Sequence, residues 1–373
     1  MASLDKAVMN KQYQRVLVTT PHPLTRLVCL GLVTFIFTLF SLELTRFGTL
    51  LAPLWFPTAI MMVAFYRHAG KMWPGIALAC SFGNVLASWM LSLGIDAWQA
   101  ARQLEMVFLD VGQGDACYLR QGKWRMLIDG GAYQEWPDGA GGIITVDYGS
   151  SVLLPFLQGQ GVNHLDAVLV SHGDSDHCGG LLAVLENVDV GLLITGPDPL
   201  EGVAEDSPYA QLLALAESRG VPRAILGRGD GFPLGDAKAS IWWPAEAGED
   251  SNESSLVLTF DYGGHICLLT GDAGLESEGE YVQGLGLVDV LKVSHHGSKG
   301  GSGELLLGVI QPRLSIVSAG ANNRYGHPAP ETLARLAEVD SQVLDTAGYG
   351  AVTVTFTVDG AIKAETMKQP YEE

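Results

Sequence analysis

The sequence predicts an α/β protein, a layered sandwich of sheets and helices, preceded by two or three membrane-spanning helices. Charge is the first reason: residues 1–103 hold 8 Lys and Arg against 3 Asp and Glu, whereas residues 104–373 hold 14 against 38. The second reason is that long uncharged apolar runs gather in the first part. The third is that short β-rich runs, Gly-rich turns and helical patterns alternate in the second part. We therefore expect a membrane segment over residues 1–103 and a folded domain over residues 104–373.

Composition limits the class of protein further. The chain has 373 residues, of which 47% are hydrophobic and 17% charged, so it is too apolar to be disordered and too irregular to be a fibre. Its five cysteines include no Cys-x-x-Cys pair, which argues against a disulfide framework. A chain of this length can bury a sizeable core without such crosslinks.

Three uncharged runs, at residues 27–42, 47–66 and 72–95, predict the membrane-spanning helices. A span needs about 20 apolar residues, so the first run is slightly short, and Pro53 and Pro57 weaken the second. A buried helical domain is one alternative, but it would offer water little polar surface. A signal peptide is another, but the first run starts late and no cleavage site ends it.

Basic residues suggest how this segment is oriented. They precede the first run, and Arg67 and Lys71 separate the second from the third. With three spans, the domain after residue 100 lies on the outer face of the inner or cytoplasmic membrane, and this is the location we expect. With two spans, that domain stays in the cytoplasm, and the spacing leaves this alternative open.

The N-terminal segment also carries a resemblance. Residues 21–84, from PHPLTRLVCL to ACSFGN, closely resemble the start of the membrane-associated sensor domain of enterobacterial diguanylate cyclases. The resemblance covers about the first 94 residues and includes neither the remaining spans of that domain nor a cyclase. It suggests a fusion remnant, a truncated reading frame or an assembly artefact, and we infer no sensory function from it.

Residues 104–373 show two successive sets of strand and helix patterns. The first set predicts strands near 105–110, 116–119, 125–129 and 167–171, with helices near 151–160 and 208–218. The second set predicts strands near 256–261, 266–270, 288–293 and 315–318, with helices near 303–310 and 330–339. Two halves of mixed strands and helices favour a layered α/β sandwich.

Four side chains that can bind metal follow the expected strand DAVLV within six residues: His172, Asp174, Asp176 and His177. A loop at a strand end can turn such ligands toward one point. A solvated loop, in contrast, gives no reason for two His and two Asp at this spacing. This segment therefore predicts a metal site.

Three further expected strands end in residues of the same kind. RMLIDGG ends at Asp129, LLTGD ends at Asp272, and VLKVSHHGS ends at the pair His295 and His296. Asp129 and Asp272 taken alone could equally be turn-forming aspartates beside glycine. Together with the first segment, they predict ligands that converge on one edge of the sandwich.

These motifs, with DVGQGD, NESSLVL and NRYGHPAPETL, resemble the metallo-β-lactamase-fold domain of ComEC, the competence DNA-uptake channel protein. The resemblance covers about residues 104–366 and is specific, because the motifs follow in the same order. It implies a metallo-β-lactamase-like αββα sandwich and a metal-dependent phosphodiester hydrolase, a DNA nuclease linked to competence DNA uptake. The many spans of the competence channel are not in this sequence, so we expect a catalytic domain and not DNA transport.

The resemblance implies two divalent metal ions, Mn²⁺ or Zn²⁺, with Mg²⁺ also open. The implied ligands are His172 and Asp174 for the first ion, Asp176, His177 and either His295 or His296 for the second, and Asp272 as a bridge. Many zinc hydrolases of the superfamily have His where this chain has Asp174. The carboxylate makes the first site richer in oxygen, which favours Mn²⁺.

Asp176, Asp272 and His327 are the expected catalytic residues. Two divalent ions about 3.5 to 4 Å apart can activate water and neutralise a phosphodiester on its way to the pentavalent state. His327, in NRYGHP, matches a family histidine and would lie by the phosphate or protonate the leaving oxygen. A structural histidine in a turn before Pro328 is the alternative.

Further residues are expected to orient ligands or contact substrate: Asp129, Asp115, Gln113, Asn252, Ser255, Ser298, Lys292, Lys299 and Arg324. Asp129 would orient a metal ligand. A tight turn is the alternative for Gln113 and Asp115, and a plain loop for the Asn and Ser residues. Cys178, next to His177, is interpreted as a small buried hydrophobe and not as a thiolate ligand.

The charge of residues 104–373, −24, opposes DNA binding at long range. A nuclease would need its metals and a local basic patch such as Lys292, Lys299, Arg313 and Arg324, while screening over about 8 to 10 Å limits the penalty. The alternatives are a hydrolase of a small ester, lactone or nucleotide on the same fold, and a membrane-tethered binding or sensory module. We expect DNA as the substrate, the membrane as a partner of the N-terminal segment, and no protein partner.

Overall fold

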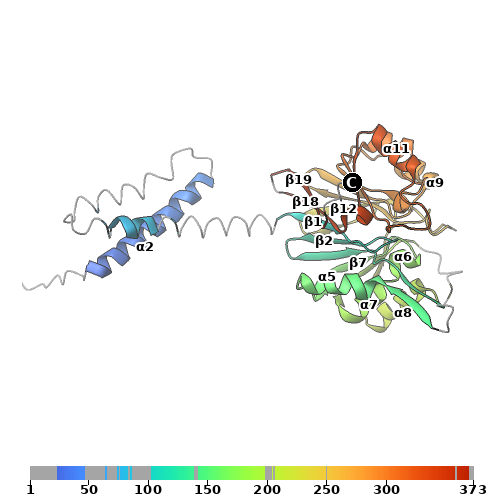
Figure 1. Cartoon of the computed structure of the whole chain (residues 1–373), viewed down its shortest axis with the longest axis horizontal. Coiled ribbons are helices and arrows are strands. Elements are labelled where there is room, and N and C mark those ends of the chain that lie inside the picture. Colours follow the sequence, from blue (N-terminus) through green and yellow to red (C-terminus); the bar gives the residue numbers. More distant parts are fainter. Residues whose placement is uncertain are drawn as a thin grey trace, which may run out of the picture. The chain divides into compact units, whose positions relative to one another are not determined.

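The computed structural model describes residues 23–46, 64, 74, 76–82, 85, 102–137, 142–197, 204, 206–248, 250–357 and 359–368 (Figure 1). The chain divides into two compact units, Met1–Trp98 and Gln99–Glu373.

In the first unit, the main described element is helix α2, Pro23–Arg46. It contains the whole of the first predicted span, residues 27–42. The Thr34 hydroxyl donates a hydrogen bond to the Leu30 carbonyl oxygen (2.9 Å) on the preceding turn. In the part of the chain that the structure describes, no helix combines the length and the apolar character needed to cross a membrane. All of the second predicted span except Ala64, and most of the third, lie outside the described residues.

The second unit is an αββα sandwich of two mixed sheets (Figure 1), so the predicted layered α/β sandwich is confirmed. In sheet order, the first sheet consists of β10 (Arg223–Ile225), β9 (Leu193–Thr195), β7 (Ala167–Leu169), β3 (Trp124–Ile128), β2 (Cys117–Gln121), β1 (Leu104–Phe108), β18 (Val352–Phe356) and β19 (Ile362–Thr366). The second sheet consists of β11 (Gly231–Leu234), β12 (Ala237–Trp243), β13 (Val257–Tyr262), β14 (His265–Leu269), β15 (Val290–Lys292), β16 (Leu314–Val317) and β17 (Gln342–Asp345).

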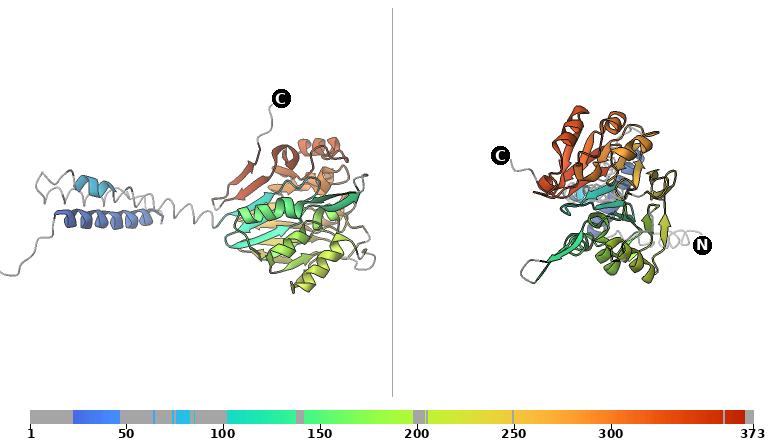
Figure 2. Two further views of the ribbon diagram at one scale, coloured as in Figure 1. Left: turned by 60° about the horizontal axis from the view of Figure 1, so that its bottom comes forward. Right: turned by 90° about the vertical axis from the view of Figure 1, so that its right-hand side faces the viewer.

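Helices cover the outer faces of both sheets (Figure 2). The first sheet is covered by α5 (Leu154–Gly159), α7 (Leu181–Asn187) and α8 (Pro208–Ser218), and the second by α9 (Leu275–Tyr281), α10 (Glu304–Ile310) and α11 (Pro330–Glu338). Successive side chains of a strand point to opposite faces of the sheet, so one strand contributes to two hydrophobic cores. In β1, Met106 and Phe108 pack between the sheets, while Val107 packs in the cluster that α5, α7 and α8 share with the first sheet.

Shorter elements complete the unit. They are the hairpin of β4 (Tyr133–Pro137) and β5 (Ile143–Asp147), the pair β6 (His164–Leu165) and β8 (Asp189–Val190), and the helical turns η3 (Gly149–Leu153), α6 (Ser175–Cys178), η4 (Ser294–Gly297) and α12 (Thr346–Tyr349). Every strand and helix predicted for residues 104–373 is present, with its ends shifted by no more than a few residues.

Parallel pairing decides where the functional residues meet. β3, β7 and β9 pair in parallel in the first sheet, as do β14, β15, β16 and β17 in the second. The carboxyl ends of parallel strands lie at the same edge of a sheet, where ligand sites of α/β proteins form. The segments that follow β7, β14 and β15 carry the predicted metal ligands, and the segment after β3 carries Asp129, which is predicted to orient one of them.

Candidate metal centre

Loops at these strand ends bring Asp and His side chains together. Asp129 follows β3, His177 lies in α6 after β7, Asp272 follows β14, and His296 lies in η4 after β15. Asp115 precedes β2, which runs antiparallel to β3 with Cys117 opposite Ile128. The start of β2 therefore lies beside the end of β3, and Asp115 joins the same edge.

Close backbone contacts explain why the loops are rich in glycine. A Cβ atom on Gly114 would lie 2.4 Å from the Asp176 carbonyl oxygen, and one on Gly180 would lie 2.1 Å from the Gly130 carbonyl oxygen. Both distances are far below van der Waals contact, so only glycine lets these loops approach. Backbone hydrogen bonds then lock them, from the Asp115 N–H to the Asp176 carbonyl oxygen (3.2 Å) and from the Gly130 N–H to that of His177 (2.6 Å).

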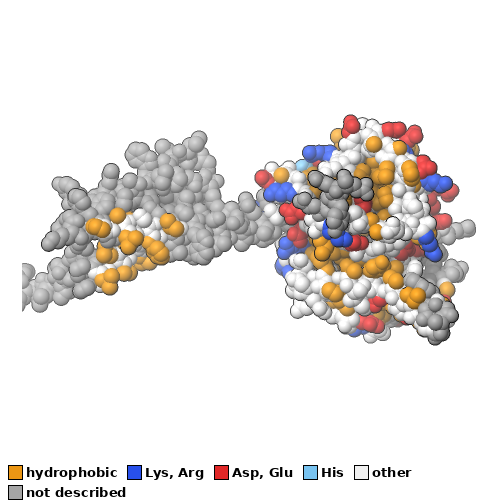
Figure 3. All heavy atoms as spheres, in the orientation of Figure 1, with side chains coloured by type: hydrophobic (Ala, Val, Ile, Leu, Met, Phe, Trp, Pro, Cys, Tyr) orange, Lys and Arg blue, Asp and Glu red, His pale blue; other side chains and the backbone are white. Residues whose placement is uncertain are grey.

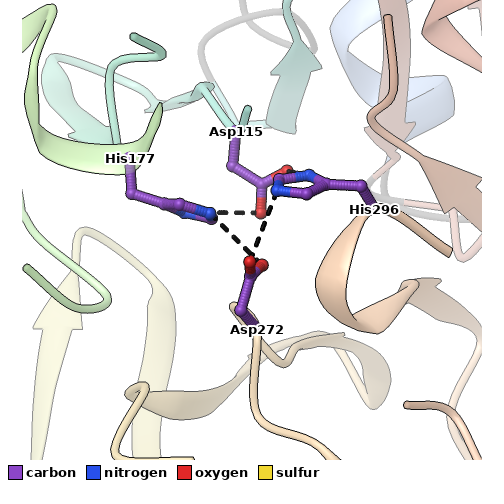
Figure 4. A group of neighbouring side chains, drawn as sticks. All are labelled: Asp115, His177, Asp272 and His296. Carbon is purple, nitrogen blue, oxygen red and sulfur yellow. Dashed lines mark ion pairs between the residues drawn. The ribbon is translucent and has the colours of Figure 1, made fainter. Parts of the chain in front are cut away.

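Four buried side chains form the centre of the site: Asp115, His177, Asp272 and His296 (Figure 4). One ligand-type atom from each lies within 4.8 Å of all the others. Asp272 contacts both histidines, with its two oxygens 3.2 Å from His177 Nε2 and 3.3 Å from His296 Nε2. We call these four residues the metal-centre cluster.

Hydrogen bonds behind the imidazoles determine which nitrogen faces the cluster. Asp129 accepts hydrogen bonds from the Ser171 N–H (2.8 Å) and hydroxyl (2.7 Å), and its second oxygen lies 3.0 Å from His177 Nδ1. His296 Nδ1 lies 3.0 Å from the Ser318 carbonyl oxygen, which can only accept. Because Nδ1 donates in both rings, Nε2 faces the cluster, and its lone pair becomes available to a cation once the ring has lost its second proton. Asp129 thus has the position expected of a carboxylate that orients a ligand.

His172 lies beside this cluster and is oriented in the same way. Its Nδ1 is 3.0 Å from the Ser171 hydroxyl, which already donates to Asp129 and so accepts from His172. Its ring centroid is 4.2 Å from that of His177, and its Nε2 is 3.7 Å from an Asp174 oxygen. Asp176 approaches from the other side, 3.5 Å from His296 Nε2. All four residues of the segment from His172 to His177 that were predicted to bind metal therefore lie at this edge.

The cluster fits a metal ion by a direct structural criterion. Five buried atoms have no hydrogen-bond partner: Asp115 Oδ1, His172 Nε2, His177 Nε2, Asp272 Oδ1 and His296 Nε2. Some of these atoms face one another at ion-pair distance, such as His177 Nε2 and Asp272 Oδ1 at 3.2 Å, and a buried polar group without a well-formed hydrogen bond costs roughly 1 to 3 kcal/mol. Five such atoms on neighbouring side chains, all of types that bind divalent cations, are explained if a cation takes them up.

Electrostatics favour the same conclusion. Burial alone would raise the pKa of Asp272, but His177 and His296 hold it well below its usual range. Burial likewise opposes a charge on His177, yet Asp272 and Asp129 raise its pKa well above the ordinary histidine value. The His296 pKa is raised in the same manner, against burial, by Asp272 and Asp115. In the protein without metal, the imidazoles thus hold protons that a cation would have to displace.

Asp115 is the residue of the cluster that the sequence did not predict as a ligand. It was expected only in a turn or at the substrate, yet its side chain is buried and its oxygens face His296 at 3.4 Å. Lys292 forms an ion pair with it and donates a hydrogen bond to the Gly271 carbonyl oxygen (3.4 Å). Burial opposes ionisation of Asp115, but Lys292 and His296 keep its pKa below the usual range. The signal was present in the sequence, because DVGQGD ends just before a strand that pairs with RMLID.

The predicted basic patch is wrong for two of its four members. Lys292 is buried, with its charge directed at Asp115 and not at the surface. Arg313 directly precedes β16, at the end of that strand opposite to the site, and pairs with Asp289 (3.7 Å). On the face of the second unit seen in Figure 3, Lys and Arg side chains are dispersed among Asp and Glu. Lys299 and Arg324 are exposed, and Arg324 lines a cavity that also contains Asp176.

The two adjacent histidines separate into different roles. His296 belongs to the cluster, whereas the His295 side chain is 35% exposed and its Nε2 is 3.8 Å from Asp272. Both have left-handed backbones, with φ of 49° and 55°. Such conformations are uncommon outside glycine and gather at functional sites. The His327 ring centroid lies 5.9 Å from that of His295, at the outer rim of the site.

The remaining predicted residues take supporting positions. The Ser255 hydroxyl accepts a hydrogen bond from the Asp272 N–H (3.1 Å), so it positions the loop that carries Asp272. Asn252 has a buried side-chain oxygen without a hydrogen-bond partner. Ser298 accepts from the Gly300 N–H (3.2 Å) within its own turn. Cys178 is buried, and burial raises the pKa of its thiol to about 12, which opposes a thiolate.

Comparison with known proteins agrees with this geometry. The family model of the metallo-beta-lactamase superfamily matches residues 109–321, which is more than half of the chain. The chain belongs to the metallo-beta-lactamase superfamily.

Individual relatives match different parts of the sequence. The chain is 32% identical to ComE operon protein 3 of Bacillus subtilis over 278 residues, which are 72% of this chain and 35% of that protein. It is 30% identical to Recombination protein 2 of Haemophilus influenzae over 285 residues, 76% of this chain and 32% of that protein. A stretch of 83 residues, 22% of this chain, is 75% identical to 8% of "Probable diguanylate cyclase DgcE" of Escherichia coli. The chain spans about a third of the first two relatives and less than a tenth of the third. Both resemblances expected from the sequence are confirmed.

Proposed function

We propose that the second unit is a metal-dependent phosphodiester hydrolase that cuts DNA. The observation that carries this proposal is the set of five buried ligand-type atoms that face one another at the sheet edge without hydrogen-bond partners. The superfamily assignment supports hydrolysis, and the concentration of carboxylates and imidazoles supports divalent cations.

The ligands divide between two ions. Asp115, His177, Asp272 and His296 would hold one of them, since their atoms already converge. His172 and Asp174, with Asp272 shared, would hold the other, and Asp176 would contact the ion nearer to His296. The large share of oxygen ligands favours Mn²⁺, with Zn²⁺ as the second candidate and Mg²⁺ as the third. When bound, two such ions would activate water and neutralise the charge that develops on the phosphodiester.

The protein's own residues would place the substrate and hold the ligands in position. Asp129 keeps the Nε2 lone pair of His177 directed at the centre. The Gln113 amide nitrogen lies 3.3 Å from His327 Nδ1 and can donate to it, which leaves the His327 Nε2–H free to donate to a phosphate oxygen. Burial, His296 and His295 lower the pKa of His327, so a neutral hydrogen-bond donor is favoured over a charged acid.

DNA as the substrate is supported by the relatives and opposed by the charge. One relative is named for a ComE operon and another for recombination, and the motif resemblance points to competence DNA uptake. The net charge of −24 after residue 103 means that affinity must come from the metal centre and nearby contacts. We further propose that the N-terminal segment attaches the protein to the cytoplasmic membrane, with the hydrolase on the outer face.

The test follows cleavage of end-labelled single-stranded and duplex DNA by the full chain, first stripped of metal and then supplied with Mn²⁺, Zn²⁺ or Mg²⁺. Asp272→Asn should remove metal binding and cleavage together. Asp236→Asn is the matched control, because Asp236 is exposed in the turn between β11 and β12. Cleavage that needs metal and is lost only in the Asp272 variant supports the proposal. Bound metal without cleavage of either DNA would favour a small ester, lactone or nucleotide instead.

A further inference from the structure

A cavity of about 510 Å³ opens beside the metal centre. Asp176 lines it, and the same carboxylate lies 3.5 Å from His296 Nε2. The other polar lining residues are Gln113, Gln134, Tyr148, Asn323, Arg324 and Tyr325. A volume of several hundred Å³ is the usual size of a small-molecule subsite. A group bound in this cavity would lie next to the part of the substrate that is held at the metal-centre cluster.

The loop that carries Tyr325 is held in a defined shape. The Asn323 side-chain oxygen accepts hydrogen bonds from the N–H groups of Tyr325 (3.1 Å) and His327 (3.0 Å). The Asn323 amide donates to the carbonyl oxygens of Gly320 (2.9 Å) and His327 (2.6 Å). One side chain thus closes the loop on itself, so Tyr325 is placed by the fold.

Tyr325 presents a supported aromatic surface. Its ring is nearly parallel to that of His327, with an interplanar angle of 25° and centroids 5.7 Å apart. The Arg324 guanidinium lies 4.8 Å from the Tyr325 ring centroid and donates a hydrogen bond to the Tyr325 hydroxyl (2.6 Å). Tyr325 is nevertheless 55% exposed, so part of its ring is open to a group that enters the cavity. Arg324 carries the lone positive charge among the polar residues that line this part of the described structure.

The lining chemistry suits a nucleobase better than a row of phosphates. The exposed amide of Gln134 offers a donor and an acceptor, which match the edges of bases, whereas the amides of Gln113 and Asn323 are engaged with His327 and with their own loop. Tyr325 offers a ring for stacking, and Arg324 can pair with one phosphate or stack on a base. A base inside a duplex has its edges paired and its faces stacked, so it could not enter without leaving the helix.

From this arrangement we infer that the cavity is a subsite for one unpaired nucleobase of a DNA strand, stacked on Tyr325, next to the phosphodiester at the metal centre. This inference rests on the proposed function and extends it, because it makes single-stranded DNA, or the frayed end of a duplex, the form that is cut. Tyr325 is then a residue that determines substrate form and has no part in metal binding.

The test uses the full chain and compares two single strands of about eight nucleotides, one with normal bases and one in which abasic units replace them. Binding is followed by fluorescence anisotropy with Mn²⁺ present, on strands whose phosphorothioate linkages resist cleavage. Stacking of one base on an aromatic side chain is worth roughly 1 to 3 kcal/mol, so Tyr325→Ala should weaken binding of the normal strand about 5- to 150-fold. The abasic strand should bind wild type and variant equally, and Tyr325→Phe should behave as wild type.

Trp124→Ala is the matched control. Trp124 is also an exposed aromatic residue with a cation above it, since Lys123 Nζ is 5.3 Å from its ring, but it lies at the start of β3, opposite to Asp129. Its replacement should leave both strands unaffected. If wild type binds normal and abasic strands equally, or if Tyr325→Ala keeps the preference for bases, the subsite is wrong.

Cleavage of the abasic strand separates this inference from the proposed function. With metal added, wild type should cut the normal strand faster than the abasic strand at low strand concentration, and Tyr325→Ala should lose this difference. Failure of both to cut either strand, with the base preference in binding intact, would overturn the proposed hydrolase and support the subsite. Equal cleavage of all strands by both proteins would support the proposed hydrolase and overturn the subsite.

Discussion

Asp115 and Lys292 show how a buried ion pair can serve a metal site at the scale of single residues. Each is almost fully buried, and neither charge would be tolerated there alone. Lys292 compensates one carboxylate, while Asp272, Asp174 and Asp176 depend on imidazoles in the protein without metal. The positive charge of Lys292 therefore allows the cluster to contain one more carboxylate than its histidines could neutralise. The charges of the other carboxylates remain available to divalent cations.

Because Asp115 and Lys292 neutralise each other, loss of one should be rescued by loss of the other. Asp115→Asn should destabilise the metal-free protein by about 3 to 5 kcal/mol, because it leaves the Lys292 charge buried without a partner. The double variant Asp115→Asn/Lys292→Met should recover most of that loss but should still bind Mn²⁺ or Zn²⁺ more weakly than wild type. Urea unfolding and calorimetric metal titration measure the two effects separately. Metal affinity restored along with stability would show that Asp115 is not a ligand.

The protonated imidazoles predict how metal binding depends on pH. His177 and His296 have pKa values raised well above the ordinary histidine value, against burial, mainly by Asp272. Both must lose a proton to bind metal, so affinity should rise with pH, by up to about a hundredfold per pH unit while both are protonated. Competition with a metal-binding dye between about pH 6 and pH 8 measures the slope, after correction for the dye. A flat profile would contradict the assignment, and His296→Gln should reduce the slope by one proton.

The sequence predicts ligand residues well where they stand close together in one motif. It predicts them poorly where segments distant in the sequence must pack together to form the site. His172, Asp174, Asp176 and His177 stand within six residues, so one loop is enough to gather them. The choice between His295 and His296 depends on two left-handed backbone conformations that no pattern encodes. Asp115 and Lys292 depend on strand pairing across the sandwich, and the charge pattern alone suggested a surface role for Lys292.

At the scale of elements, the loops of the site depend on glycine packing. Gly180 precedes α7 with an ordinary helical φ of −68°, so its need for glycine comes from the 2.1 Å approach to the Gly130 carbonyl oxygen alone. Gly180→Ala should destabilise the protein by more than about 2 kcal/mol, since backbone would have to move. Gly308→Ala, in α10 with nothing near the added Cβ, is the control and should stabilise by up to about 1 kcal/mol. Equal thermal shifts for the two variants would contradict this account.

A buried carboxylate joins α9 to the start of α10. Both oxygens of Glu278 accept from the Gly303 N–H (3.0 and 2.9 Å), yet burial raises the pKa of Glu278 to about 7. The folded protein therefore binds this proton more tightly than the unfolded chain, and the stability from protonation is present at low pH and lost as pH rises from about 4.5 to about 7.

The test compares unfolding free energies of wild type and Glu278→Gln across this range. Wild type should lose about 3 kcal/mol relative to the variant between about pH 5 and pH 8, because a shift of one pKa unit is worth about 1.4 kcal/mol. Glu280→Gln is a matched control from the surface of α9 and should show no such trend. Parallel profiles for wild type and Glu278→Gln would rule out the raised pKa.

The strands that the sequence predicts have clear apolar runs, although β18, with the alternating sequence VTVTF, is not among them. β13 and β14 have near-continuous apolar runs, and their boundaries are predicted to within a residue. The hairpin of β4 and β5 is not predicted: β4 has no apolar run, and the apolar run of β5 is largely exposed in a separate two-stranded sheet. β6, β8 and β10 have two or three residues each, and pairing with neighbours, not local preference, makes them strands.

At the scale of the whole molecule, the sequence joins two parts of different character. The first 103 residues are basic and apolar and include a stretch similar to a diguanylate cyclase, while the rest is acidic and belongs to the metallo-beta-lactamase superfamily. Charge and composition predict this join without a structure. They do not predict where a cavity lies on this acidic domain. The cavity lined by one basic residue, Arg324, is known only from the fold.

The central claim is that the cluster around Asp272 binds divalent metal, and the most direct test is the metal content of the protein. Full chain equilibrated with Mn²⁺ or Zn²⁺, freed of excess metal and analysed by mass spectrometry of the intact protein should carry two ions. Asp272→Asn should carry none or one, while Asp236→Asn should match wild type. Wild type that carries no metal, or an Asp272 variant that carries the full amount, would contradict the account.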